Sequence, residues 1–177
     1  MFKIIFMPKP TEGTFPPFFS TYTNKVQEDD VAAAFKNQQE LVETFFDTIP
    51  KDKEEFAYAP GKWTLKEMLQ HIIDTERIFA YRALCIARHE KQSLPGFDEN
   101  KYASNSQAKA RRWESLVAEL KLVRKSTQIL FDSFSPETLQ QPGISNNNPV
   151  TVNAIGFITV GHLYHHIEVI RERYLLG

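Results

Sequence analysis

The chain has 177 residues, of which 42% are hydrophobic and 24% are charged, and its formal net charge is −1. A chain of this length and composition can bury one sizeable core, so we expect a single domain over residues 1–177. The near-neutral charge excludes a general electrostatic attraction to nucleic acid or to an anionic membrane surface.

Cysteine content and hydropathy indicate the cellular setting. Cys85 is the only cysteine, so the chain can form neither an intramolecular disulfide nor a cysteine-rich zinc site. The apolar run at residues 1–7 is too short for a signal peptide, and no stretch approaches the roughly 20 apolar residues of a membrane span. We therefore expect a cytoplasmic protein that does not enter a membrane.

The first segment, residues 1–23, is predicted to be extended because prolines interrupt it repeatedly, at Pro8, Pro10, Pro16 and Pro17. Its aromatic side chains are too apolar for a free tail, namely Phe15, Phe18, Phe19 and Tyr22. We expect this segment to lie as a strap against a helical body formed by residues 24–177.

Four segments then carry apolar residues at helical spacing: residues 29–48, 64–89, 106–133 and 151–176. No segment has a convincing strand pattern, and turn residues fill the link between the third and fourth helices. The pattern predicts an all-α fold, a four-helix bundle with an extended N-terminal segment. The links before and after the third helix are long enough to cross an end of the bundle, so the order of the helices stays open.

The second predicted helix begins with a capping box, in which Thr64 and Glu67 can satisfy each other's backbone N–H groups. Glu76 falls at the centre of the apolar face of this helix. A buried carboxylate needs a partner. We favour a structural ion pair, with candidates Arg82, Arg171 and Arg173. The alternative is a hydrogen bond to a metal-bound histidine, which would make Glu76 a second-shell residue.

Histidines supply the clearest functional pattern. His162 and His166 are one helical turn apart on an apolar stripe, so both imidazoles leave the same face and can bind one metal ion. His71, on the flank of the second helix, is the third candidate ligand. His165 points about 100° away from its neighbour His166, which suits a second-shell or surface role. Two hydrogen-bonded core histidines would explain the same spacing, so both interpretations stay open.

Three imidazoles suit one late divalent transition metal, with zinc or nickel as the leading candidates. Three protein ligands leave a coordination position for water or substrate, as in catalytic zinc sites. Such a metal lowers the pKa of its bound water toward about 7, or binds and activates a thiolate.

Several motifs together resemble the DinB/YfiT-like family of metalloenzymes. The resemblance rests on residues 59–64, on 71–77 and 81–84, on 94–98, and on Gly161-His162 with His165-His166, followed by 172–175. It extends over nearly the whole chain. It implies a four-helix bundle, often a homodimer, with a divalent metal held at the positions of His71, His162 and His166.

The resemblance leaves the reaction open. Related proteins include S-transferases and isomerases that use a low-molecular-weight thiol, and metal-dependent hydrolases. We therefore expect an enzyme that activates a thiol or water at the three-histidine site and acts on a small molecule. The alternative is a noncatalytic metal- or ligand-binding, stress-associated dimer. The sequence assigns neither a catalytic residue beyond the ligands nor a binding site for an organic cofactor.

Overall fold

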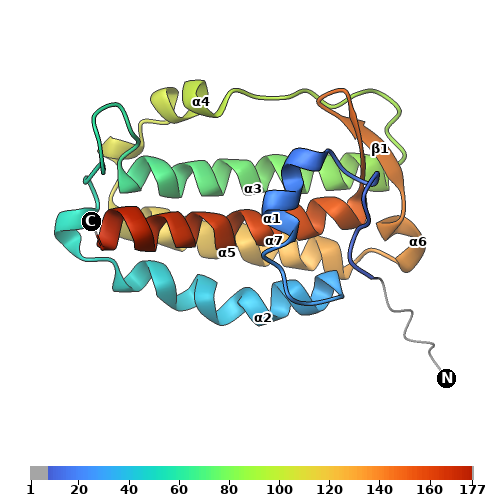
Figure 1. Ribbon diagram of the computed structural model, residues 1–177, viewed down its shortest axis with the longest axis horizontal. Helices are drawn as coiled ribbons and strands as arrows, with labels where there is room; N and C mark the ends of the chain where they lie inside the picture. Colours follow the sequence, from blue (N-terminus) through green and yellow to red (C-terminus); the bar gives the residue numbers. More distant parts are fainter. Residues whose placement is uncertain (1–7, 177) are drawn as a thin grey trace.

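The structure is a computed structural model that describes residues 8–176, so the first seven residues of the predicted strap lie outside the described part. Its body is a bundle of long helices, as predicted (Figure 1). The bundle helices are α2 (Val31–Thr44), α3 (Leu65–Ala87), α5 (Trp113–Asp132) and α7 (Val152–Val169). A 3-10 segment, Phe45–Thr48, extends α2, and a π-helical segment, Ile170–Leu175, extends α7.

The bundle does not follow a simple up-down-up-down order. The helices α3 and α5 lie side by side and run in the same direction, whereas α2 and α7 run in the opposite direction (Figure 1). Two side-chain bonds show the shared direction: Arg111, just before α5, binds Gln70 near the start of α3, and Arg124, further along α5, binds Glu76, further along α3. The chain between α3 and α5 must therefore return along the whole length of the bundle.

That return connection shortens the third predicted helix. Residues 106–112, which we expected to be helical, precede α5, which begins at Trp113. The connection contains a separate short helix, α4 (Glu99–Asn105), and Asp98 caps its first turn. The backbone then takes a left-handed conformation at Gln107, with φ 55°, which ends helical continuity before α5.

The turn-rich link before α7 contains a short helix, α6 (Pro136–Leu139), and a hairpin that the sequence did not predict. Its antiparallel strands are β1 (Pro142–Ser145) and β2 (Asn148–Thr151). Both residues of its turn, Asn146 and Asn147, have positive φ, which is the conformation of the tight hairpin turns that favour asparagine. The strands are only four residues long and contain prolines, which hides them from a periodicity analysis.

The side chains at the helix starts explain where the helices begin. The predicted capping box is confirmed: the backbone N–H of Thr64 donates to Glu67 Oε2 over 2.8 Å, and Glu67 N–H donates back to Thr64 Oγ1 over 3.3 Å. The Asp30 carboxylate accepts from the first turn of α2, and the Thr151 hydroxyl accepts from the first turn of α7.

The helix α7 is the most buried element of the fold, since every residue from 152 to 163 is buried. The helices α2 and α3 pack on it, and the strap covers its outer side through the short helix α1 (Ser20–Thr23) (Figure 1). Phe15 is buried as expected of a strap residue, whereas Phe18 is 68% exposed and does not serve as an anchor.

One buried hydrogen-bond network links all four long helices. Arg124 of α5 donates from Nε and Nη2 to the two carboxylate oxygens of Glu76 on α3, each over 2.8 Å. Its Nη1 donates to Gln38 Oε1 on α2, and Gln38 Nε2 donates to the carbonyl of Val160 on α7 over 2.9 Å. Because every partner is buried, this network fixes the helices in one register.

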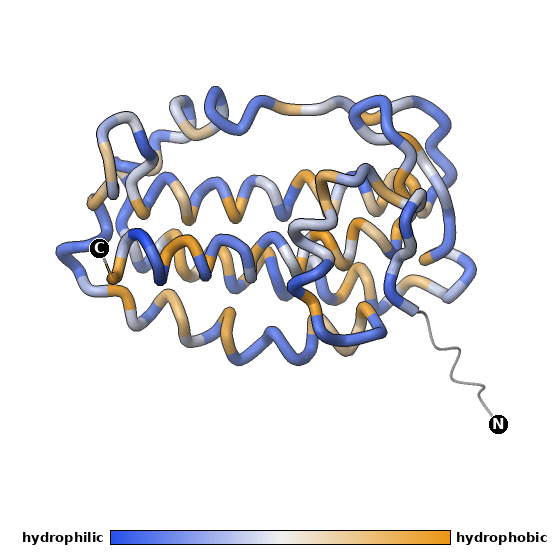
Figure 2. Tube along the Cα trace, in the orientation of Figure 1, coloured by the Kyte–Doolittle hydropathy of each residue, from blue (hydrophilic) through white to orange (hydrophobic). Residues whose placement is uncertain are grey.

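Apolar residues recur on one side of α2, α3 and α5, whereas α7 is apolar over most of its length (Figure 2), and the buried apolar residues form two adjoining core clusters. Among residues 8–176, no helix combines the length and the apolar composition needed to span a membrane.

Candidate metal centre

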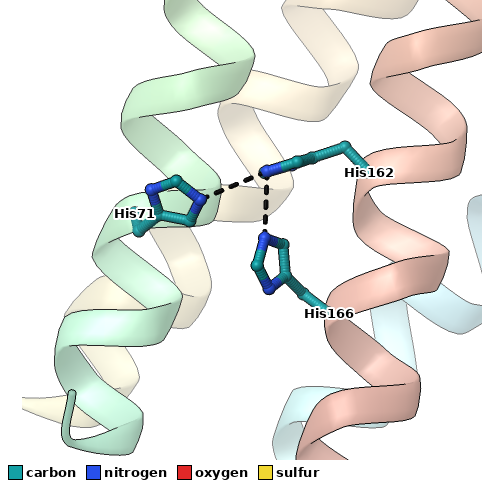
Figure 3. A group of neighbouring side chains, drawn as sticks. All are labelled: His71, His162 and His166. Carbon is teal, nitrogen blue, oxygen red and sulfur yellow. Dashed lines mark hydrogen bonds between the residues drawn. The ribbon is translucent and has the colours of Figure 1, made fainter. Parts of the chain in front are cut away.

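Three histidines from two antiparallel helices converge at one point. His71 extends from α3, and His162 and His166 extend from α7 (Figure 3). Nε2 of His162 lies 3.2 Å from Nε2 of His71 and 3.0 Å from Nε2 of His166. The structure thus brings together the three residues that the sequence singled out as candidate ligands, each presenting a ring nitrogen to the same small volume.

Hydrogen bonds among the three rings cannot satisfy all of their ring nitrogens. A neutral imidazole nitrogen has either one N–H to donate or one lone pair to accept with, so His162 Nε2 can form a good hydrogen bond to one of its two neighbours but not to both. In addition, His166 Nδ1 is buried and has no hydrogen-bond partner among residues 8–176. Leaving ring nitrogens unsatisfied inside the protein costs about 1–3 kcal/mol each.

A transition-metal ion fits the same nitrogens. Two ligands at about 2.0–2.1 Å from one tetrahedral zinc ion lie about 3.3 Å apart, close to the 3.0 and 3.2 Å separations around His162 Nε2. All three candidate ligand atoms lie within 4.8 Å of one another. Imidazole nitrogen is also a preferred ligand of zinc and nickel. The donor set and the spacing are therefore suitable for one late divalent ion.

Burial keeps the three imidazoles neutral, which is the form that binds metal. Burial, with a smaller effect from His165, lowers the pKa of His71 to about 4. The pKa values of His162 and His166 fall well below the usual range, again mainly through burial. The lone pairs are consequently free of protons at neutral pH, and a metal ion meets little competition from protons.

Aromatic and hydroxyl groups position the rings. The Trp63 ring centroid lies 4.8 Å from that of His71, and His71 Nδ1 lies 3.4 Å from Thr75 Oγ1, one turn further along α3. The Tyr22 ring of the strap meets His162 edge-on at 5.3 Å. These contacts restrict the rotation of His71 and His162, so their nitrogens stay directed at each other.

The strap approaches the site closely because residue 161 is glycine. A Cβ atom at Gly161 would lie 2.1 Å from the backbone oxygen of Tyr22, a distance that no side chain tolerates. The absence of a side chain at Gly161 therefore lets Tyr22 lie against the neighbouring residue His162.

All three histidines line one cavity of about 600 Å³. This volume is in the range that holds small organic molecules. Its wall combines α3, α7, the strap, the hairpin and the segment after α3, and its lining includes Phe19, Tyr22, Trp63, Phe79, Arg82, Phe97, Asn146 and Asn148. A second, smaller cavity of about 360 Å³ lies beside His165 and His166.

Glu76 and His165, the two residues expected beside the metal ligands, have different positions. The prediction that Glu76 forms a structural ion pair is confirmed, but its partner is Arg124 and not Arg82, Arg171 or Arg173. Both carboxylate oxygens of Glu76 bind Arg124, and Glu76 makes no hydrogen bond to the histidines among the described residues, so its role beside a metal ligand stays a prediction. The His165 ring lies 5.0 Å from that of His166 and stays a candidate neighbour of the site.

The sequence alone did not identify some residues of the site. Arg124 continues the apolar stripe of its helix, four residues after Leu120 and three before Thr127, and a lone arginine in such a stripe is the signal that identifies a partner for Glu76. Tyr22 and Trp63 gave no comparable signal, because their places depend on how the strap and the start of α3 pack.

Comparisons with known proteins agree with the helical-bundle fold. No curated protein sequence matches the chain. YfiT from Bacillus subtilis, described as a probable metal-dependent hydrolase with an unusual four-helix bundle topology, has a similar structure with a TM-score of 0.64. The alignment covers 93% of this chain and 90% of that chain at 17% identity, which establishes a shared fold. A sequence model of the DinB superfamily matches residues 34–170, most of the chain. The protein therefore belongs to the DinB superfamily.

Proposed function

We propose that the protein is a metal-dependent enzyme that acts on a small molecule, with His71, His162 and His166 holding one divalent zinc or nickel ion. The observation that carries this proposal is the position of the three histidines in the wall of a cavity of about 600 Å³. Three protein ligands leave a coordination position available, and the cavity gives a small molecule access to it.

When bound, a zinc or nickel ion supplies a nucleophile at neutral pH, either by acidifying water or by binding a thiolate. The residues around the site shield and orient the histidines. Trp63, Phe79 and Tyr22 surround the histidines with aromatic rings, which limits the access of bulk water. Thr75 fixes the orientation of His71 through Nδ1, leaving Nε2 as the ligand atom.

We favour water as the nucleophile, and hydrolysis as the reaction, on the description of YfiT as a probable metal-dependent hydrolase. Transfer to a low-molecular-weight thiol is the second arm of the test, because the same ligand set activates both nucleophiles. Noncatalytic binding of metal or ligand is the third possible outcome. The homodimer and the cytoplasmic location stay predictions.

Turnover measurements with metal-loaded protein test this proposal. Panels of esters and amides are assayed without thiol, and electrophiles are assayed with a series of low-molecular-weight thiols. We expect thiol-independent turnover that disappears in His162→Ala and persists in His89→Ala, which alters an exposed histidine outside the cavity. Turnover that requires a thiol would show that the reaction is transfer to a thiol and not hydrolysis. Metal binding without turnover on either panel would favour the noncatalytic function.

A further inference from the structure

Arg82 is a buried cation in the wall of the cavity that holds the three histidines. We propose that Arg82 binds an anionic group, a carboxylate or a phosphate, of the molecule that occupies this cavity. This inference deepens the proposed function, on which it rests, by naming the chemical class of the substrate.

The first observation is that Arg82 lacks an acidic partner. Its residue surface is only 6% exposed, yet it forms no ion pair within 4.0 Å among residues 8–176. Nη2 donates to the carbonyl of Pro95 over 2.7 Å, whereas Nε is buried and has no acceptor. A guanidinium has five N–H donors, so most of its bonding capacity remains unused within the described structure.

The buried Arg124 shows what a fully paired arginine looks like in the same bundle. Its three nitrogens bind Glu76 and Gln38, and no nitrogen of this side chain is left without an acceptor. Burial of an unpaired charge is costly and is normally compensated by an opposite charge. Arg82 lies beside open volume, so an anion from outside the chain can provide that compensation.

Two aromatic rings set the guanidinium in place without neutralising it. Its Cζ atom lies 6.0 Å from the centroid of Phe79 and 5.8 Å from that of Phe97. Such cation–π contacts offset part of the cost of burial and restrict the side chain. Burial lowers the pKa of Arg82 from its usual value, and an arginine still carries its charge at neutral pH.

The rest of the cavity wall suits an anion near Arg82. Asn146 and Asn148 of the hairpin and Thr75 of α3 contribute neutral hydrogen-bonding groups. Glu99 is the single carboxylate among the lining residues, and it is exposed and forms no ion pair with Arg82. The charge of Arg82 is therefore not cancelled within the cavity.

The helix geometry separates the anionic group from the reacting bond. His71 and Arg82 lie on the same helix, and eleven residues make about three turns, so the two side chains leave nearly the same face. Their Cα atoms are about 16 Å apart along the axis, at about 1.5 Å per residue, but the side chains come closer. The Phe79 centroid lies 6.0 Å from Arg82 Cζ and 5.9 Å from the His162 ring. A substrate that reacts at the histidines therefore reaches Arg82 with its anionic group by passing Phe79.

Calorimetric titration of the full chain tests this assignment without relying on activity. The probes are phenylbutyrate, its neutral amide phenylbutyramide and phenyl phosphate, each titrated into metal-loaded and metal-free protein. We expect at least one anion to bind about tenfold more tightly than the amide, in both forms of the protein. Comparison of the carboxylate with the phosphate shows which of the two anions the site prefers.

Matched variants assign the preference to Arg82. Arg82→Gln is expected to abolish it by weakening the binding of the anion much more than that of the amide, and Arg82→Lys is expected to keep part of it because the charge remains. Arg77→Gln is the control, since Arg77 lies on the same helix but is half-exposed, pairs with Glu119 and does not line the cavity. Circular dichroism verifies that each variant is folded.

Several outcomes would contradict the binding of an anion by Arg82. Absence of any anion preference in the wild-type chain at millimolar probe, or a preference that survives Arg82→Gln, would overturn the assignment. A preference that appears only in metal-loaded protein would place the anion on the metal instead. If the enzyme turns over with metal and KM is unchanged in Arg82→Gln, the role of Arg82 is wrong but the proposed catalysis is not. If the anion binds through Arg82 and no turnover is found, the role of Arg82 holds and the proposed catalysis is wrong.

Discussion

Nε2 of His71 lies 3.2 Å from Nε2 of His162, although 91 residues separate them in the chain. Two neutral imidazoles that face each other through these atoms form at most one hydrogen bond, and His166 adds a third ring at the same point. Protonation of one ring would place a positive charge in a buried cluster. The stability of the metal-free protein should therefore depend on pH.

We predict that the metal-free protein loses stability as the pH falls below about 6.5. The pKa of His71 is about 4 in the folded chain, against about 6.5 in an unfolded chain, so between these values the unfolded chain takes up more protons. At about 1.4 kcal/mol per pKa unit, His71 alone contributes on the order of 3 kcal/mol. The lowered pKa values of His162 and His166 act in the same direction.

Urea denaturation of chelator-treated protein at a series of pH values between 7 and 4 measures this effect. His71→Gln removes one titrating group and should reduce the dependence of the unfolding free energy on pH. A stability that stays constant or rises as the pH falls, with the helical fold intact, would contradict the prediction.

The ion pair between Glu76 and Arg124 gives a second prediction. Replacing Arg124 by Met leaves the Glu76 carboxylate buried without a partner, so we expect a loss of about 3–5 kcal/mol in the free energy of unfolding. Arg77→Met is the matched control, because its pair with Glu119 is half-exposed and should contribute less than about 1 kcal/mol.

The double variant Glu76→Leu with Arg124→Leu separates an unpaired charge from a lost contact. Removing both charges should restore most of the stability that Arg124→Met loses. If the double variant is as unstable as the single one, the cost would lie in the loss of packing or of the bond to Gln38, and not in a buried unpaired carboxylate.

The sequence predicted the elements whose pattern is local. Apolar spacing identified the bundle, and the capping box placed the start of α3 at Thr64. The three histidines were selected because one helical turn separates His162 from His166 and because His71 lies on a flank that can reach a neighbouring helix. The structure brings these three residues together.

The features that the sequence did not predict depend on contacts between distant segments. The partner of Glu76 is set by the parallel arrangement of α3 and α5, which no local pattern encodes. The cavity is formed where the strap and the hairpin approach the helices, so the role of Arg82 became visible only with the neighbours of its side chain. The strands β1 and β2 are too short, and too rich in proline, to show the two-residue alternation of apolar and polar residues that marks a strand.

Gly161 provides a third prediction, which concerns the strap. In Gly161→Ala the new methyl group meets the Tyr22 backbone oxygen, so the strap must move away from α7. We expect a loss of about 1–3 kcal/mol and faster hydrogen exchange in residues 15–26. Hydrogen-exchange mass spectrometry measures that local change.

Gly156→Ala is the control for this variant. A Cβ atom at Gly156 also meets close neighbours, but these are the side chains of Val31 and Phe131 and not the strap. We therefore expect Gly156→Ala to lower stability without increasing exchange in residues 15–26. Equal exchange of the strap in both variants would show that Gly161 has no particular role in seating it.

The metal content of purified protein tests the central claim most directly. After expression with zinc or nickel and removal of loosely bound ions, elemental analysis should find about one ion per wild-type chain, since three-imidazole sites bind one late divalent ion. His71→Ala, His162→Ala and His166→Ala should each lose most of this metal while circular dichroism shows retained helices, and His89→Ala should keep it. One tightly held ion per chain in any of the three ligand variants, or none in the wild-type chain, would contradict a metal site formed by these histidines.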